Sequence, residues 1–251
     1  MERITSLKNP KVQGWKALKE RKGRRESGCF LVEGFKMVEE ALASSFTVEA
    51  VLAQEDCLAA LPAHPDCPVY LLPAGVLAAV CDTKTPQGVA AVVRMAQRPA
   101  QGGRLIALDG VQDPGNVGTL LRSAAAFGFD GVLLSKGCAA PFAPKTLRAS
   151  MGAAGRLPVA PVQDLPQALQ QLRARGVVCL AAALYHSRPL DEAPQSYPDG
   201  LCAVIGSEGQ GLTDAAVQAC DMAVRIPMTD LVESLNAGVA GSVLLWHFRG
   251  V

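Results

Sequence analysis

Polar side chains that could perform chemistry stand in three short segments of the C-terminal half of this sequence. The segments read LDGVQDPGNVGTLLRSAAAFG (108–128), AVIGSEGQGL (203–212) and RIPMTDLVESLNAGVAG (225–241). Each begins as an apolar strand, breaks at a turn rich in Gly, Pro or Asn, and continues toward a helical pattern. Since α/β proteins build their sites at the carboxyl ends of strands, one cleft could collect the polar side chains of all three. These are Asn116, Arg122, Glu208, Ser234 and Asn236.

The turn GSEGQG spaces its glycines as G-x-x-G-x-G, at Gly206, Gly209 and Gly211. This order differs from the G-x-G-x-x-G of dinucleotide-binding proteins, and no Walker lysine follows it. Taken alone, the turn is typical of an ordinary connection between a strand and a helix. A site is indicated because Glu208 lies inside the turn and the other two segments lie at comparable strand ends.

Asn116 and Arg122 each allow two interpretations. Asn116 stands where a helix would start, so it could be a simple N-cap. Arg122 falls in the apolar stretch TLLRSAAAFG, and a buried guanidinium needs anionic or carbonyl partners. One such partner is a structural carboxylate such as Glu208. The alternative partner is a phosphate or a hydroxyl group of a substrate.

In the third segment, Ser234 could cap another helix. The small residues that follow, Gly238, Ala240 and Gly241, suit close packing of that helix against a second subunit. The preceding IPM (226–228) is apolar and lacks one backbone donor at the proline. It suits the wall of an adenine pocket, or equally an ordinary strand end.

Other chemistries find little support in the residue pattern. The histidines are far apart, and neither HExxH nor a G-x-S-x-G elbow is present, which argues against hydrolases. Eight cysteines stand singly with no C-x-x-C pair, so we expect small buried hydrophobes in a reducing cytoplasm, without disulfides or a metal site. The N-terminus lacks an apolar h-region, and no apolar run reaches the roughly 20 residues of a membrane span. We therefore expect a soluble cytoplasmic protein.

Charge is distributed unevenly along the chain. The net charge is only +1, but residues 1–36 hold ten Lys or Arg against four Glu, a local charge of +6. Clustered cations gain affinity for a polyanion by releasing counterions from its phosphates, although such a cluster could equally be a solvated helix face. The candidates for polyanion contacts are Lys8, Lys11, Arg21, Lys22, Arg24 and Arg25.

The strand and helix patterns predict two α/β domains. Asn9-Pro10 predicts the start of a first helix, and strands and helices then alternate to about residue 95. Residues 96–103 have the composition of a linker. From 104 to 251, apolar runs without period-2 alternation predict strands buried on both faces of a mostly parallel sheet.

In their residues and in their order along the chain, the three segments resemble the signature motifs of the SpoU/TrmH family of RNA ribose 2′-O-methyltransferases, within the SPOUT superfamily. The resemblance covers essentially the whole chain. Residues 104–251 resemble the catalytic domain, and residues 1–95, with SLKNPKV and FLVEGFKMVEEAL, resemble the small RNA substrate-binding domain of members that act on ribosomal RNA. The resemblance implies a parallel sheet with a C-terminal trefoil knot, an exception to the rule against threaded chains. It also implies a homodimer with active sites at the interface, and RNA as the polyanion bound by the N-terminal cations.

The activity that the resemblance implies is transfer of a methyl group from S-adenosylmethionine to a ribose 2′-OH of RNA, with ribosomal RNA preferred to transfer RNA. Because a sugar hydroxyl is a poor nucleophile at neutral pH, the site must orient it and assist loss of its proton. Arg122 matches the family's catalytic arginine, which binds the adjoining phosphate and helps to activate the hydroxyl. The other polar motif positions, which orient substrate and loops, are Asn116, Glu208 and Asn236. The positions that match the cofactor wall are Leu184, Gly206, Ile226, Ser234 and Leu235.

The third motif departs from the family's pattern. It reads VESLNAGVAG where many relatives have S-x-S-L-N-V-S-x-A, so Ala237 and Gly238 alter the start of the last helix. Ser234, Leu235 and Asn236 are kept, so we still expect cofactor binding. The alternative is a catalytically silent RNA-binding or ribosome-assembly factor, against which the retained polar residues of the first two motifs argue. The sequence indicates neither the modified nucleotide nor the particular RNA.

Overall fold

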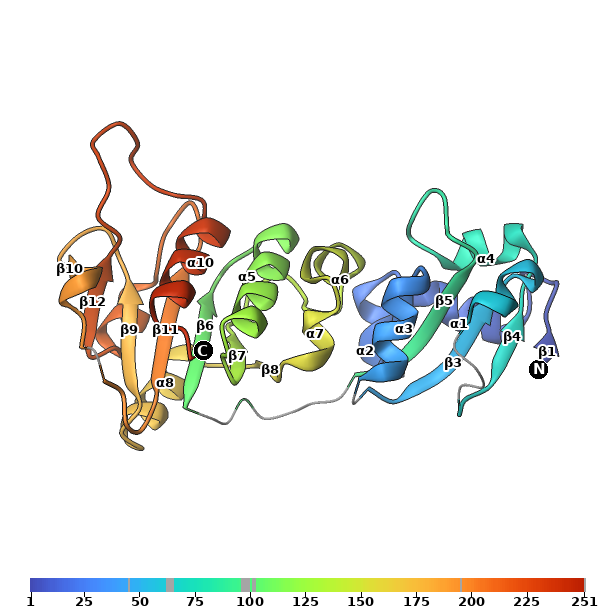
Figure 1. The fold of residues 1–251 in the computed structure, drawn as a ribbon, viewed down its shortest axis with the longest axis horizontal. Coiled ribbons are helices and arrows are strands. Elements are labelled where there is room, and N and C mark those ends of the chain that lie inside the picture. The colour runs from blue at the N-terminus through green and yellow to red at the C-terminus, as the bar shows by residue number, and fades with distance from the viewer. Residues whose placement is uncertain (45, 62–65, 96–99, 101–102, 195, 251) are drawn as a thin grey trace. The chain divides into compact units, whose positions relative to one another are not determined.

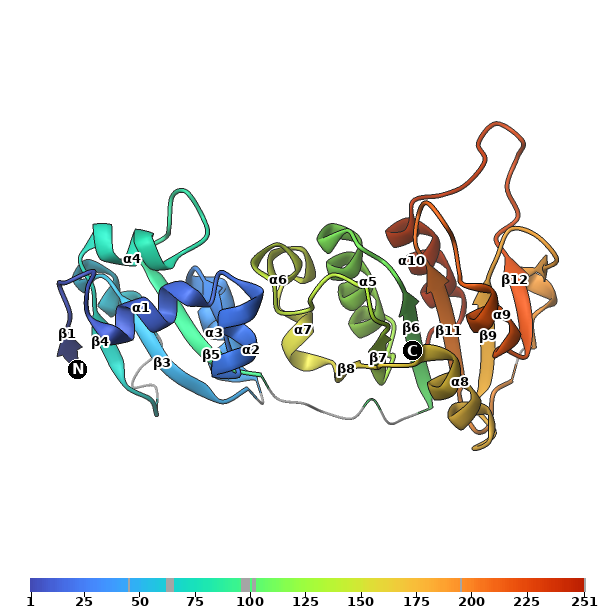
Figure 2. The same cartoon turned by 180° about the vertical axis from the view of Figure 1, so that it is seen from behind.

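The computed structural model describes the 251-residue chain except residues 45, 62–65, 96–99, 101–102, 195 and 251. Contacts divide the chain into two compact units (Figure 1, Figure 2). Unit 1 comprises Met1–Ala96 and Phe142–Arg156, and unit 2 comprises Gln97–Pro141 and Leu157–Val251. Most of the predicted linker, 96–103, lies outside the described residues, and the division into domains at that linker stays a prediction.

Unit 1 holds a mixed five-stranded sheet of order β1-β4-β3-β5-β2. β1, β4 and β3 are parallel, whereas β5 runs antiparallel to both β3 and β2. The strands are β1 (Glu2–Arg3), β2 (Cys29–Glu33), β3 (Val48–Ala53), β4 (Val69–Leu71) and β5 (Val89–Arg94). The helices are α1 (Pro10–Ala17), α2 (Arg21–Ser27), α3 (Phe35–Ala43), the 3-10 helix η1 (Glu55–Ala60), α4 (Ala74–Val80), α6 (Pro144–Ser150) and α7 (Ala153–Arg156).

Helix α1 begins where the sequence predicts. Asn9 is its N-cap and accepts a hydrogen bond from the backbone N–H of Lys11 at 2.9 Å. Pro10 takes the first helical position, where a missing N–H costs nothing. Val12 and Trp15 form the buried face of α1, in one core with residues of α4 and the sheet.

The segment Phe142–Arg156 belongs to unit 1 by its contacts, although both of its neighbours in sequence belong to unit 2. Phe142 stacks on Phe30 of β2, with ring centroids 4.7 Å apart. Arg148 of α6 forms an ion pair with Asp82 at 2.9 Å. These contacts make the segment part of the packing of unit 1.

Unit 2 is built on a seven-stranded sheet of order β10-β12-β9-β11-β6-β7-β8, in which every described strand pairing is parallel. Strands β6, β9 and β11 are buried over most of their length, as strands covered on both faces must be. The prediction of a parallel sheet is therefore confirmed. The strands are β6 (Arg104–Asp109), β7 (Gly131–Leu134), β8 (Val159–Pro161), β9 (Val178–Ala182), β10 (Arg188–Pro189), β11 (Leu201–Gly206) and β12 (Met222–Arg225).

Helices cover both faces of this sheet. α5 and α10 lie side by side on one face, and α8 and α9 lie on the other, where Leu169 and Ala216 share a core with Cys179 (Figure 1, Figure 2). Gly241 of α10 allows α5 to approach closely, since a Cβ there would stand 2.2 Å from Cδ2 of Leu120. The helices of unit 2 are α5 (Pro114–Ala126), α8 (Leu165–Arg173), the 3-10 helix η2 (Leu190–Glu192), α9 (Asp214–Gln218) and α10 (Ala237–His247).

The chain does not pass through this sheet in sequential order. After β11 it forms β12, which lies on the far side of β9, and α10 then returns to pack on β11 and α5. Such a return is compatible with the trefoil knot that the family resemblance implies. The knot itself stays a prediction.

All eight cysteines are free thiols. Five of them are buried, and burial raises the pKa of both Cys81 and Cys220 to about 12. A thiol with such a pKa stays protonated at neutral pH and is a poor nucleophile. These side chains therefore pack as small apolar groups, as the sequence predicts.

Candidate active site

The carboxyl ends of four parallel strands meet at one edge of the unit 2 sheet. Asp109 at the end of β6 is paired with Gly206 at the end of β11, and Ala182 at the end of β9 is paired with Val224 of β12. The loops that follow β6, β11 and β12 contain the polar residues of the three motifs or lead directly to them. Open parallel sheets bind their ligands in loops at this edge.

A hydrogen bond between side chains joins the first motif to the second. Nδ2 of Asn116, in the first turn of α5, donates to Oε1 of Glu208 in the loop after β11. Asn116 is not the helix cap, an interpretation that the sequence left open. Asp113 caps α5 instead, accepting from the backbone N–H of Asn116 at 2.9 Å. The side chain of Asn116 is therefore available to hold the Glu208 carboxylate.

The third motif begins α10, and Asn236 is the N-cap of that helix. Its Oδ1 accepts from the backbone N–H groups of Gly238 and Val239, at 2.9 and 3.3 Å. This corrects the interpretation of Ser234 as the cap. Asn236 is the cap in place of Ser234 because its amide oxygen lies directly at the first free N–H groups of the helix.

Gly238 brings the first and third motifs into contact. A Cβ at this buried position would stand 2.9 Å from Oδ1 of Asn116 and 3.1 Å from Oδ1 of Asn236. Glycine at position 238 thus makes room for two motif amides. The structure brings together Asn116, Glu208 and Asn236, three of the polar residues that the sequence singled out.

Arg122 lies on α5 but outside this group. The expectation of a buried guanidinium is wrong, because Arg122 is exposed and α5 buries other positions, among them Val117 and Leu121. Six residues separate Arg122 from Asn116, a rotation of about 240°, so the two side chains leave the helix on different faces. Over the described residues, no ion pair is formed between Arg122 and Glu208. The guanidinium is accessible to an anion from solution.

The residues that match the cofactor wall lie in loops at the same sheet edge. Leu184, after β9, is 43% exposed. Leu231, which is not among the matching positions, lies between β12 and α10 and is 90% exposed. Ser234 is exposed as well, whereas Ile226 and Leu235 are half-buried. Exposed apolar side chains next to backbone polar groups are what the adenine ring of a nucleoside cofactor covers. The residues present therefore fit S-adenosylmethionine.

Gly206 has a structural reason of its own to be glycine. The loop after it folds back, and Ser207 and Gly211 donate to each other's carbonyls, both at 3.0 Å. A Cβ at position 206 would stand 2.2 Å from the carbonyl carbon of Gly211 and 2.4 Å from the nitrogen of Leu212. Glycine at 206 thus lets the loop that carries Glu208 close onto the end of β11.

The sequence analysis did not identify a buried carboxylate at this edge. Asp109 is 8% exposed and accepts from the hydroxyl of Ser135 at 3.1 Å. It also accepts from the backbone N–H and the hydroxyl of Thr213, at 2.9 and 2.8 Å. The available signal was an acidic residue as the last residue of the apolar run RLIALD.

Arg24 of the N-terminal cluster is structural, which corrects its assignment as a polyanion contact. It is 6% exposed, and its Nη1 donates to the carbonyls of Leu18 and Lys19 at 2.8 and 2.6 Å. Burial lowers the pKa of Arg24. Its guanidinium therefore holds the turn between α1 and α2, where RNA cannot reach it.

The other cations of the cluster differ in their surroundings. Lys11 forms an ion pair with Glu2 at 2.6 Å and lies over the ring of Tyr70, 4.5 Å from its centroid. The hydrogen bond to Glu2 is the main reason why the pKa of Lys11 is raised. Lys8, before α1, is exposed, and the exposed cations of α2 are Arg21, Lys22 and Arg25.

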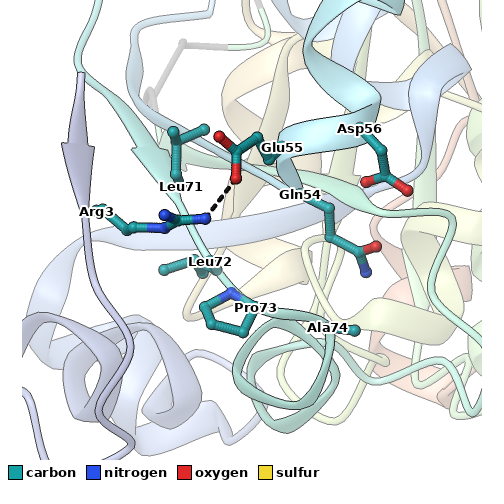
Figure 3. A pocket seen from close by; sticks show the side chains of 8 residues that line it. All are labelled: Arg3, Gln54, Glu55, Asp56, Leu71, Leu72, Pro73 and Ala74. Carbon is teal, nitrogen blue, oxygen red and sulfur yellow. Dashed lines mark hydrogen bonds and ion pairs between the residues drawn. The ribbon is translucent and has the colours of Figure 1, made fainter.

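A hollow of about 230 Å³ lies in unit 1, and none of its lining residues is among those singled out by the sequence (Figure 3). Arg3 and Glu55 form an ion pair across it, and Leu71, Leu72 and Pro73 line it (Figure 3). Arg3 and Glu55 thus satisfy each other, and the third charged lining residue, Asp56, takes part in none of the described ion pairs.

Within the described part of the chain, no cluster of three His, Cys, Asp or Glu side chains could hold a metal ion. Among the same residues, no helix has the length and apolar character needed to cross a membrane.

The fold and the site define an α/β protein with a parallel sheet whose motif loops gather at one edge. The model of the SpoU rRNA Methylase family matches residues 103–246, and that of the MRM3-like substrate binding domain matches residues 9–91. The chain belongs to the SpoU rRNA Methylase family.

Relatives and solved structures of this family extend over the whole chain. A relative from Bacillus subtilis, the 23S rRNA (guanosine(2553)-2′-O)-methyltransferase RlmP, is 37% identical and covers 100% of both chains. The AdoMet-bound rRNA methyltransferase from Sinorhizobium meliloti superimposes with a TM-score of 0.87 at 29% identity, covering 98% of this chain and 96% of that one. The SpoU methyltransferase AviRb from Streptomyces viridochromogenes, in complex with AdoMet, gives 0.83 at 25% identity, covering 96% and 97%.

Replacing Gly206 tests how tightly the Glu208 loop is closed. In Gly206→Ala the new methyl group meets backbone atoms, which cannot move aside, so we expect the free energy of unfolding to fall by about 1–3 kcal/mol. Chemical denaturation measures the change. Gly209→Ala is the matched control, because a Cβ there meets nothing within 4 Å. Equal stabilities of the two variants would contradict the closed loop.

Proposed function

We propose that this protein transfers the methyl group of S-adenosylmethionine to a ribose 2′-OH of ribosomal RNA. The observation that carries the proposal is the meeting of Asn116, Glu208 and Asn236, from three separate motifs, at the strand edge where parallel sheets bind ligands. It is supported by family membership and by full-length similarity to a 23S rRNA 2′-O-methyltransferase. A ribosomal RNA substrate agrees with the cytoplasmic location predicted from the sequence.

The catalytic roles follow from the chemistry of each group. When bound, S-adenosylmethionine supplies an electrophilic methyl group on a sulfonium. The exposed guanidinium of Arg122 is a planar cation with several N–H donors, so it binds the phosphate beside the target ribose and fixes the 2′-OH. Asn116 and Glu208 hold each other, and Asn236 fixes the start of α10, so that the loops around the ribose keep one geometry.

The cofactor is held by residues of the loops after β9, β11 and β12. Their exposed apolar side chains cover the adenine ring, and backbone groups of these loops supply hydrogen bonds. Gly206 contributes mainly by letting the loop after β11 close. The residues proposed for this role are Leu184, Gly206, Ile226, Ser234 and Leu235.

The functional form is a homodimer formed through α10. Val239, Val243 and Trp246 recur at spacings of four and three residues on this helix, and they are 50%, 37% and 54% exposed. Such a stripe of large apolar side chains suits a second copy of the same surface. A dimer also explains the position of Arg122, which lies off the Asn116 and Glu208 group within one chain, because sites at an interface can combine groups from two copies.

Methyl transfer to RNA tests the reaction and the substrate class together. We expect labelled methyl groups from S-adenosylmethionine to appear on a ribose of unmodified ribosomal RNA and not on transfer RNA. Arg122→Ala should lower the rate at least 100-fold while cofactor binding, measured by calorimetry, stays nearly intact, because the residue binds RNA phosphate.

The controls separate the alternatives. Label on transfer RNA alone would overturn the ribosomal substrate, and full activity of Arg122→Ala would remove that residue from the mechanism. Cofactor and RNA binding without transfer to any RNA, including precursor and assembly-stage ribosomal RNA, would indicate a silent RNA-binding factor.

Exposed cations of α2 should set the salt dependence of RNA binding. Replacing Arg21, Lys22 and Arg25 by Ala should weaken binding roughly tenfold at moderate salt and lower the slope of log affinity against log salt by up to about 3. Filter binding across a salt series measures both quantities. The control is Arg3→Ala with Arg94→Ala, since Arg3 and Arg94 donate hydrogen bonds to Glu55 and Glu49. For the three cations replaced in the triple variant, the described ion pairs include only the looser contact of Lys22 with Glu26 at 3.8 Å. An unchanged slope in the triple variant would make the cluster a solvated face.

Negative charge introduced into the apolar stripe of α10, Val239, Val243 and Trp246, should dissociate the dimer. Val239→Glu with Trp246→Glu should lower the mass in sedimentation from two copies of the 26.2 kDa chain to one, because paired carboxylates would be buried at the interface. Leu7→Glu is the matched control, an exposed apolar residue of unit 1. A wild-type protein that sediments as a single chain would refute the homodimer.

A further inference from the structure

Asp109 is the buried acid at the strand edge, and neutral groups supply its described hydrogen bonds. Its carboxylate lies at the end of β6, is 8% exposed, and takes part in none of the described ion pairs. Burying an acidic group is costly unless donors satisfy it. Its three described donors come from two residues on other elements of the same edge, Ser135 after β7 and Thr213 before α9.

Two loops take their positions from this carboxylate. Oδ2 accepts both the backbone N–H and the hydroxyl of Thr213, which is the last residue of the Glu208 loop and the N-cap of α9. Oδ1 accepts the hydroxyl of Ser135, after β7. The Ser135 hydroxyl in turn accepts the N–H of Gly110, the first residue of the loop that leads into α5.

The same two loops contain or lead to the groups proposed for catalysis. The loop between Gly206 and Thr213 carries Glu208, and it is fixed at one end by its fold onto β11 and at the other by Asp109. The loop after Gly110 leads to Asn116, which donates to Glu208. Asp109 thus holds both of the loops whose side chains, Asn116 and Glu208, bond to each other.

We infer that Asp109, acting through Thr213 and Ser135, is a positioning residue for methyl transfer. It sets the distance between the Glu208 loop and the start of α5 and does not touch substrate or cofactor. The inference rests on the proposed function and adds to it a residue outside the groups named there. Supporting groups of this kind commonly change activity 10- to 100-fold when removed, because small misplacements at a reacting centre are amplified.

Thr213 offers the sharpest test, because Val has the shape of Thr without its hydroxyl, whereas Ser keeps the hydroxyl. Thr213→Val should lower kcat for methyl transfer 10- to 100-fold and leave KM for RNA within about twofold, since the N-terminal cations bind the RNA. Thr213→Ser should restore kcat to within about threefold of the wild type. A rate per folded molecule that is unchanged in Thr213→Val would overturn the inference.

Loss of the helix cap needs its own control, because the Thr213 hydroxyl also accepts the N–H of Ala216 at 3.3 Å. Asp164→Ala removes the equivalent cap of α8, where Asp164 accepts from the N–H of Gln167 at 2.9 Å. We expect this variant to keep full kcat. Ser135→Ala, which removes the Oδ1 donor and leaves both caps intact, should lower kcat in the same way as Thr213→Val. If Asp164→Ala reduces kcat as much as Thr213→Val, the effect is one of stability and the inference fails.

Hydrogen exchange gives a readout that does not require activity. Amides of residues 206–213 should exchange at least tenfold faster in Thr213→Val than in the wild type or in Thr213→Ser. Should the wild type transfer no methyl group, the proposed function fails while the exchange data still decide whether Asp109 orders this loop. Unchanged exchange in Thr213→Val would overturn the positioning role whatever the wild-type activity.

Discussion

The parallel, in-register pairing of β6 with β11 is the constraint on which the site depends. It places Asp109 and Gly206 opposite each other at the same edge of the sheet. From that point one loop leads into α5 and the other folds back before α9, so two motifs far apart in sequence begin side by side. The carboxylate of Asp109, at the end of β6, holds Thr213 at the end of the second loop. Glycine at 206, at the end of β11, leaves the space into which that loop folds back.

Close approach of α5 and α10 completes the arrangement. Two glycines of α10 make it possible, one against Leu120 and one against Asn116, where a side chain would meet atoms closer than van der Waals contact allows. The second of these, Gly238, lies against two motif amides. The absence of a side chain at that position leaves room for the amide oxygens of both Asn116 and Asn236.

The electrostatics of the two units serve different purposes. In unit 1, the guanidinium of Arg24 donates to backbone carbonyls of the preceding turn and is buried. The cationic surface is therefore smaller than the sequence suggests, because only the exposed side chains contribute to it. In unit 2, the guanidinium of Arg122 is exposed and therefore accessible to an anion such as a phosphate. The carboxylate of Asp109 is buried and is satisfied by neutral donors. Under the proposed function, exposed charges bind the phosphates of RNA, whereas the buried carboxylate orders the loops around it.

The sequence by itself determined the parallel sheet, the start of α1 and the three motifs, because apolar runs, caps and glycine-rich turns are local signals. It also identified Asn116, Glu208 and Asn236, which the fold brings together. Only the tertiary structure decided which residues cap α5 and α10, that Arg122 is exposed and Arg24 buried, and that residues 142–156 pack with unit 1. These properties depend on which helix face meets the sheet and on donors contributed by distant strands, such as those on Asp109. No pattern along one segment contains that information, because each partner lies on another segment.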